Sequence, residues 1–287
     1  MSEIRKVTVL GIGILGSQIA FQTAFSGFEV TAYDIDDAAL AAARDRFAEL
    51  VPRYRREVPG AAENDKAERT AAQITLTSEL AEAVRDADLV IEAVPEILTL
   101  KQDVYKRIGD LAPERAIFTT NSSTLLPSDI EDFTGRPDKF LALHFANQIW
   151  KHNIAEIMGT PDTDPAVYEK VVDFATAIGM IPIELHDEIS GYVLNTLLRP
   201  FISAGLTLVA DGYATPETVD RAWCIGTGAT EGPLQIVDIS GLNTSYNVFS
   251  QGTDDERQLA AWLKENYIDK GKLGRSTGEG FYTYPDR

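Results

Sequence analysis

The sequence is poor in the residues that build disulfide frameworks and metal centres. Its 287 residues include one cysteine, Cys224, and three histidines. A single thiol cannot form an intrachain disulfide, and the histidines have no zinc-ligand spacing. We therefore expect neither a disulfide scaffold nor a metal site. The 44% hydrophobic content is typical of a soluble protein that buries a core.

Basic residues and uninterrupted apolar runs are also scarce. Lysine and arginine number 26 against 44 acidic residues, so the net charge is -18. Such a surface repels nucleic acid, which we exclude as a partner. No signal peptide is recognisable at the start. The most apolar stretch, residues 192–210, contains Asn195, Arg199 and Pro200. We interpret it as a buried helix with no membrane role, and we expect a cytoplasmic protein.

A nucleotide-binding signature lies near the start of the chain. Residues 7–10 predict a buried strand, and an apolar-periodic helix ending near Gly27 follows a glycine-rich loop. The loop consists of Gly11, Ile12, Gly13, Ile14, Leu15 and Gly16. A second strand, residues 30–33, ends on Asp34. Together these features predict a dinucleotide site, with pyrophosphate at the helix N-terminus and ribose hydroxyls on Asp34. The acid would repel a 2′-phosphate, which favours NAD over NADP.

The pattern of elements changes near Asp187. Up to that point strands alternate with helices, which predicts an α/β fold with a doubly wound, mostly parallel sheet. Beyond it only helices are indicated. We therefore divide the chain into a nucleotide-binding domain, 1–187, and an all-helical C-terminal domain, 188–287. A separate apolar helical domain often serves as a dimer interface, so we expect a homodimer.

Polar residues follow two of the predicted strands. Glu96 and Lys101 come after strand 88–94, and the run Asn-Ser-Ser-Thr at 121–124 comes after strand 116–120. Open α/β sheets bind ligands at the carboxyl ends of their strands. The serines could equally cap a helix expected to start near Pro127, and both interpretations stay open.

An arginine-rich segment follows the second predicted helix. We expect that helix over residues 38–50, with Pro52 interrupting it. Arg53, Arg55 and Arg56 come next. They could bind an anionic substrate tail, but a solvated basic face is the more common explanation of such a run.

His144 is the strongest candidate for proton transfer. Its apolar strand, residues 140–145, would also suit an ordinary core histidine. Its neighbours favour chemistry, because Ser123 lies one strand earlier and Glu156 one strand later. A histidine, with an unperturbed pKa of about 6.5, can take a hydroxyl proton as hydride leaves carbon. A carboxylate on its far nitrogen would fix the tautomer and stabilise the imidazolium.

With these residues in place, the chain resembles the 3-hydroxyacyl-CoA dehydrogenase family along nearly its whole length. The matching motifs are G-I-G-I-L-G at 11, I-E-A-V-P-E at 91, N-S-S at 121, L-H-F-A-N at 143, G-Y-V-L-N at 191, E-G-P at 231 and T-G-E-G-F-Y at 277. The resemblance implies a Rossmann-like domain followed by an all-helical dimerisation domain.

The resemblance also assigns roles to individual residues. It implies that His144 and Glu156 are the catalytic pair and that Ser123 and Asn195 contact the substrate. Beyond the glycines and Asp34, it places cofactor contacts on Glu96, Lys101 and Ser123. The implied cofactor is NAD.

Several positions depart from the family pattern. Leu50 and Glu57 stand where the family holds coenzyme A with a serine and a lysine, and residues 147–153 replace a P-x-P segment. These features resemble most the diketoreductase-like members, which reduce β-keto and β,δ-diketo esters. Asn147, Trp150 and Trp223 would then line an acyl pocket, although core packing would explain the two tryptophans equally well.

We therefore expect an NAD(H)-dependent oxidoreductase that interconverts 3-keto and 3-hydroxy acyl compounds. One alternative is a short-chain 3-hydroxyacyl-CoA (3-hydroxybutyryl-CoA) dehydrogenase that uses the arginines at 53, 55 and 56 for the CoA phosphates. A gulonate-type sugar-acid dehydrogenase and a non-catalytic, crystallin-like NAD-binding protein are further alternatives. The His144–Glu156 pair argues against the last of these.

Overall fold

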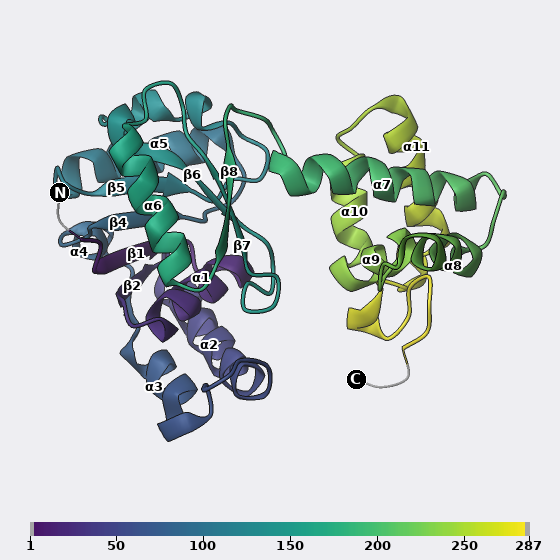
Figure 1. Cartoon of the computed structure of the whole chain (residues 1–287), viewed down its shortest axis with the longest axis horizontal. Coiled ribbons are helices and arrows are strands. Elements are labelled where there is room, and N and C mark those ends of the chain that lie inside the picture. Colours follow the sequence, from purple (N-terminus) through teal and green to yellow (C-terminus); the bar gives the residue numbers. More distant parts are fainter. Residues whose placement is uncertain (1–2, 285–287) are drawn as a thin grey trace. The chain divides into compact units, whose positions relative to one another are not determined.

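The computed structural model describes residues 3–284. The chain divides into two compact units, Met1–Val193 and Leu194–Arg287. The first contains an eight-stranded sheet with helices on both faces, and the described part of the second contains helices and no strand (Figure 1).

The sheet of the first unit is almost entirely parallel. Its strands are β1 (Lys6–Leu10), β2 (Glu29–Tyr33), β3 (Thr75–Thr77), β4 (Leu89–Glu92), β5 (Ile117–Thr120), β6 (Phe140–Phe145), β7 (Ile154–Met158) and β8 (Ile181–Leu185). They lie in the order β3-β2-β1-β4-β5-β6-β7-β8. Among the strand pairs of the described residues, only β6–β7 is antiparallel. This arrangement confirms the predicted doubly wound, mostly parallel sheet.

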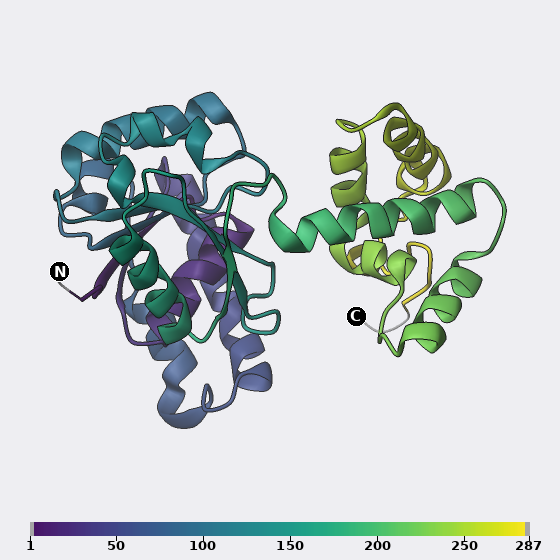
Figure 2. The same ribbon diagram turned by 45° about the horizontal axis from the view of Figure 1, so that its top comes forward.

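Helices cover the two faces of the sheet as two layers (Figure 2). They are α1 (Ile14–Phe25), α2 (Asp37–Glu57), α3 (Lys66–Gln73), α4 (Leu80–Val84), α5 (Leu98–Leu111) and α6 (Pro165–Ala177). One core cluster joins α1, α2, α3 and α6 to side chains such as Val7 and Ile157. The other joins α4 and α5 to Val90 and Phe118. Since successive strand residues point to opposite faces, both layers draw on the same strands.

Helix α2 is longer than the sequence predicts. It continues through Pro52 to Glu57, so the expected end at residue 50 was wrong. The reason is tertiary packing, because Leu50 and Tyr54 are buried and the Tyr54 ring lies 4.5 Å from that of Phe21. This contact outweighs the hydrogen bond that a proline removes from a helix.

The arginine-rich end of α2 is engaged with acidic neighbours. Arg55 pairs with Asp65 and Glu68, and Arg56 pairs with Glu57. All these side chains are at least partly exposed. The contacts fit the interpretation of this segment as a solvated face.

The helix expected from Pro127 is absent from the described residues. Three separate 3-10 turns, Pro127–Asp129, Glu131–Phe133 and Pro137–Lys139, take its place. Two of them begin with a proline, which suits a first position but supplies no N–H to continue a helix. Consequently no α-helix begins where the serines of residues 121–124 could cap it.

The described part of the second unit contains five α-helices, followed by a C-terminal segment with two 3-10 turns. The helices are α7 (Tyr192–Ala210), which starts in the last residues of the first unit, α8 (Pro216–Thr227), α9 (Pro233–Ser240), α10 (Leu242–Phe249) and α11 (Asp254–Asn266). The buried Asp238 accepts hydrogen bonds from the N–H groups of Phe281 and Tyr282 and from the Tyr284 hydroxyl. One carboxylate therefore ties the end of α9 to the C-terminal segment.

Helix α7 is less buried than expected. Only 17% of its most apolar stretch is buried, so the prediction of a buried helix was wrong for the single chain. Among the described residues α7 is the one helix long and apolar enough to cross a membrane, judged by length and composition alone. A lone helix of this kind is weak support for a membrane span.

The glycine-rich loop between β1 and α1 is shaped by two close backbone approaches. Gly11 has a φ of +87°, and a Cβ there would lie 2.7 Å from the Ala93 carbonyl oxygen. A Cβ at Gly16 would lie 1.9 Å from the Gly11 carbonyl oxygen. Gly13 is different, because a Cβ there would have nothing within 4 Å. The first and third glycines thus build the turn, and the middle one leaves open space above it.

We predict that alanine substitution at two glycines of this loop affects stability very differently. Gly16→Ala should lower the free energy of unfolding by about 1–3 kcal/mol, because the backbone must shift to admit the methyl group. Gly13→Ala, whose methyl group meets open space, should leave it nearly unchanged. Urea denaturation of both variants checks this, and equal stability would contradict the steric account.

Candidate active site

His144 and Glu156 face each other across neighbouring strands. In the antiparallel β6–β7 pair the register places His144 directly opposite Glu156. Their side chains are 6% and 1% exposed, and Nδ1 of the imidazole lies 3.0 Å from Oε2 of the carboxylate. The spacing of twelve residues therefore covers the end of β6, the connecting loop and the start of β7, which brings the chain back to the position opposite His144. A carboxylate only accepts hydrogen bonds, so Nδ1 carries a hydrogen atom and donates a hydrogen bond to Glu156.

The other imidazole nitrogen meets Ser123. The Ser123 hydroxyl lies 3.0 Å from Nε2. In a neutral imidazole with its single N–H on Nδ1, Nε2 accepts a hydrogen bond from this hydroxyl. Ser123, His144 and Glu156 thus form a continuous hydrogen-bonded chain. The Ser123 hydroxyl and Nε2 lie on the side of the imidazole away from Glu156, where a substrate hydroxyl or carbonyl oxygen could exchange a proton with Nε2.

The loop that carries Ser123 is held by Glu96. Oε1 of Glu96 accepts hydrogen bonds from the Ser122 hydroxyl at 2.6 Å, from the Ser123 N–H at 3.0 Å and from the Thr124 N–H at 2.8 Å. Burial by itself raises the pKa of Glu96, but hydrogen bonds from Ser122 and Thr124 and the charge of Lys101 outweigh it and lower the pKa. A charged Glu96 therefore fixes the loop after β5.

A buried ion pair lies beneath this loop. Lys101 Nζ is 2.6 Å from Oε1 of Glu92 and 3.5 Å from Oε2 of Glu96, and the Lys101 side chain is 1% exposed. Burial raises the pKa of Glu92, and Lys101 opposes that rise. Thr120 also donates to Glu92 at 2.8 Å. Lys101 thus connects the end of β4 to Glu96, and its predicted contact with the cofactor stays a prediction.

The glycine-rich loop and Asp34 form the expected nucleotide cradle. No side chain caps α1, which begins at Ile14, so its first N–H groups are free to meet an anion. Asp34 accepts the Ile12 N–H at 2.9 Å, which holds the acid beside the loop. Arg46 donates to the Ile12 carbonyl at 2.8 Å. With open space above Gly13, these residues fit a dinucleotide whose pyrophosphate lies on the helix N-terminus.

The remaining predicted substrate residues lie in different surroundings. Asn147 is exposed in the loop after β6. Trp150 packs against Tyr54, 5.4 Å between ring centroids. In the second unit, Asn195 lies half-buried on the first turn of α7, and Trp223 lies 4.4 Å from the Phe201 ring. Both tryptophans thus have an aromatic neighbour, although Trp223 is 40% exposed. A substrate contact at any of these positions stays a prediction.

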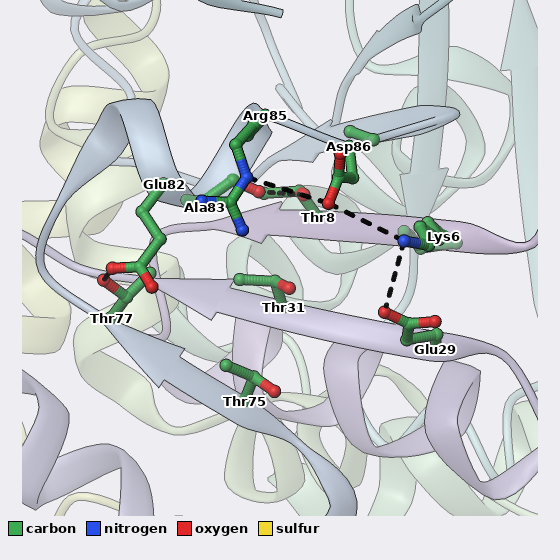
Figure 3. Close-up of a pocket in the computed structure, with 12 residues that line it drawn as sticks. Lys6, Thr8, Glu29, Thr31, Thr75, Thr77, Glu82, Ala83, Arg85 and Asp86 are labelled. Atoms are coloured by element: carbon green, nitrogen blue, oxygen red, sulfur yellow. Dashed lines mark hydrogen bonds and ion pairs between the residues drawn. The ribbon is translucent and has the colours of Figure 1, made fainter.

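A small cavity occupies the opposite end of the sheet. It measures about 190 Å³ and lies near the amino ends of β1 and β2 (Figure 3). Thr31 and Thr75 line it, and Lys6 Nζ lies 3.7 Å from both Glu29 and Asp86 at its rim. None of the predicted site residues lines this cavity, so it is separate from the candidate active site.

Two residues of the site were not anticipated from the sequence. Glu92 has a visible signal, a lone acid inside the apolar strand L-V-I-E, because a buried carboxylate requires a partner. Arg46 has none, since it lies among several surface arginines of α2. Only the fold shows that its guanidinium reaches the glycine-rich loop.

Comparison with known families covers nearly the whole described chain. Residues 6–188 match the NAD binding domain of 3-hydroxyacyl-CoA dehydrogenase, and residues 191–284 match its C-terminal domain. Mitochondrial hydroxyacyl-coenzyme A dehydrogenase of Rattus norvegicus is 33% identical over 98% of this chain and 91% of its own length.

Solved structures give the same result. A diketoreductase structure, described in terms of substrate-directed dual catalysis of dicarbonyl compounds, is 60% identical with a TM-score of 0.96, covering 99% of this chain and 100% of that one. The (S)-3-hydroxybutyryl-CoA dehydrogenase of Ralstonia eutropha is 27% identical with a TM-score of 0.84 and the same coverage. These matches confirm NAD as the cofactor and oxidoreduction at CH-OH groups as the activity. The chain belongs to the 3-hydroxyacyl-CoA dehydrogenase family.

Proposed function

We propose that this protein reduces the 3-keto group of β-keto or β,δ-diketo esters reversibly, with His144 and Glu156 as its acid–base pair. The observation that carries the proposal is the hydrogen-bonded chain from Ser123 through His144 to Glu156. Such a chain provides what a metal-independent carbonyl reduction needs, which is a proton delivered from one defined atom within the NAD-binding domain.

Each residue of the chain has a distinct task in this proposal. The bound cofactor supplies hydride to the substrate's 3-keto carbon. His144 then gives the Nε2 proton of its imidazolium to the oxygen that gains charge. Glu156 holds Nδ1–H and balances the positive charge of the ring. Ser123 donates a hydrogen bond to that oxygen. The family resemblance implies that Asn195 orients the carbonyl.

The contacts of Glu57 support a substrate without coenzyme A. Glu57 accepts the Trp150 Nε1–H at 2.8 Å, and that bond, with Arg56, lowers the pKa of Glu57. It therefore stays negatively charged and repels phosphates. Leu50, the other position that corresponds to a CoA contact, is buried in the core. The 60% identity to a diketoreductase points to the same substrate class.

A second candidate is a 3-hydroxybutyryl-CoA dehydrogenase. It is favoured by the printed names of relatives such as the Bacillus subtilis protein, a probable 3-hydroxybutyryl-CoA dehydrogenase that is 29% identical over 99% of this chain. In that case the CoA phosphates would need another cation. Arg53 is the one of the three arginines for which the described contacts include no acidic partner.

Removing the imidazole should abolish most of the turnover. We expect His144→Ala to lower kcat by about 10²–10⁴-fold, the usual contribution of general acid–base catalysis, with the dissociation constant for NADH nearly unchanged. Steady-state kinetics and NADH fluorescence titration measure both. His186→Ala, which alters an exposed histidine, is the matched control. Near-normal turnover of His144→Ala would end this mechanism.

A substrate panel decides between the two candidates. Oxidation of NADH at 340 nm is followed with acetoacetyl-CoA, ethyl acetoacetate and a 3,5-diketo ester. We expect kcat/KM for the plain esters to equal or exceed that for the thioester, because Glu57 and Leu50 offer coenzyme A no contact. A preference for acetoacetyl-CoA of tenfold or more would favour the second candidate.

The exposed apolar side chains of the second unit support a homodimer formed through it. Leu197 and Leu208 on α7 are 67% and 43% exposed, and Ile225 on α8 is 78% exposed. Helices α7 and α8 contact each other through Phe201 and Trp223, and exposed large apolar side chains on such a helix pair are typical of a surface that another chain covers. A second copy of this chain would cover the surface without requiring any other protein. The cytoplasmic location expected from the sequence stays a prediction.

Charge placed on this surface should separate the copies. We expect sedimentation velocity of the wild-type protein to give twice the mass of one chain, and Leu197→Glu with Ile225→Glu to give the mass of one. Ile181→Glu on β8, an exposed apolar residue of the first unit, serves as control. A wild-type monomer, or dissociation by the control alone, would contradict an interface in the second unit.

A further inference from the structure

Tyr192 covers one face of the His144 imidazole. The two rings are stacked, with centroids 4.4 Å apart and planes inclined by only 6°. The tyrosine is 1% exposed and packs in a small cluster with Ala142 and Met158. An imidazole whose face is covered in this way cannot tip out of its plane without displacing a buried aromatic ring.

Hydrogen bonds join Tyr192 and the residue after it to the loop of Ser123 and to Glu156. Its hydroxyl donates a hydrogen bond of 2.8 Å to the Ser122 carbonyl, next to Ser123. Burial raises the pKa of Tyr192, so the phenol keeps the proton that it donates. The following peptide N–H, of Val193, donates to Oε1 of Glu156 at 3.0 Å. The start of α7 therefore contacts His144, Glu156 and the loop that carries Ser123.

The backbone at this point adopts an unusual conformation. Tyr192 has a φ of +53°, and Gly191 before it has a φ of +88°. A left-handed conformation is uncommon for a bulky side chain, and such strain persists where the surroundings enforce it, often at functional sites. Here it is the conformation that brings both the ring and the Val193 N–H to His144 and Glu156.

We propose that Tyr192 is a positioning residue for the reaction. Its ring fixes the plane of the His144 imidazole, so that Nδ1 stays on Glu156 and Nε2 stays on Ser123. Its hydroxyl and the next peptide N–H lock that ring to the Ser122 carbonyl and to Glu156. The residue exchanges no proton with the substrate, and it acts through the orientation of His144.

The inference rests on the proposed role of His144 and predicts which kinetic constant changes when the ring of Tyr192 is lost. Misalignment of a proton donor by about 1 Å can cost roughly 10²-fold in rate without weakening ground-state binding. Loss of the ring should therefore appear in kcat and leave KM and NADH binding little changed. A residue with a purely structural role would change thermal stability without that separation.

The experiment compares two substitutions at position 192. Tyr192→Leu removes the flat ring and should lower kcat with ethyl acetoacetate by about 10–100-fold, with KM and the NADH dissociation constant within about twofold. Tyr192→Phe keeps the ring and loses only the hydroxyl. It should restore kcat to within about fivefold of the wild type.

A matched control uses another tyrosine of the first unit. Tyr168 donates its hydroxyl to a backbone carbonyl, that of Ile157, and makes no described contact with His144. Tyr168→Leu should leave kcat within about twofold of the wild type, and thermal melting of every variant reports folding.

Three results would overturn the proposal. They are a kcat of Tyr192→Leu within twofold of the wild type, a loss no larger than that of Tyr168→Leu, and a kcat of Tyr192→Phe as low as 1% of the wild-type value. The last also decides the case if Tyr192→Leu does not fold. Full turnover of His144→Ala would instead overturn the proposed function, so the two failures are distinguishable.

Discussion

The hydrogen bond between His144 and Glu156 depends on a reversal of chain direction inside an otherwise parallel sheet. Parallel neighbours need long crossover connections, whereas β6 and β7 are joined by a short loop and run antiparallel. The return places residue 144 opposite residue 156, in the interior of the first unit. Burial then strengthens the bond, because few water molecules compete for either group.

The surrounding residues hold this pair from several sides at once. Glu96 accepts hydrogen bonds from the loop that carries Ser123, and the ammonium group of Lys101 pairs with the carboxylates of both Glu96 and Glu92. Leaving one partner of such a buried ion pair unpaired costs about 3–5 kcal/mol. The left-handed backbone at Tyr192 adds a local cost of about 1–3 kcal/mol. The site is thus stabilised by buried contacts that oppose local strain.

The sequence was most informative where local chemistry decides the structure. The glycine-rich loop needs residues without a Cβ, and the strand ends carry polar residues, so both were predictable from the chain alone. It was least informative where distant packing decides. The continuation of α2 past Pro52 depends on the contact of Tyr54 with Phe21, and the reach of Arg46 depends on how α2 lies over the loop. The antiparallel register of β6 and β7 likewise has no signal in either strand by itself.

Asp238 sets an order of events during synthesis of the chain. The N–H group of Phe281 that it binds is made 43 residues later. At about 5–20 residues per second, that interval lasts roughly two to nine seconds. Until then the donors that bind the carboxylate in the folded structure have not been made, and burying it without them would be costly. The sheet-containing unit, whose strands are all made earlier, can therefore fold while the helical unit still waits for its last segment to emerge.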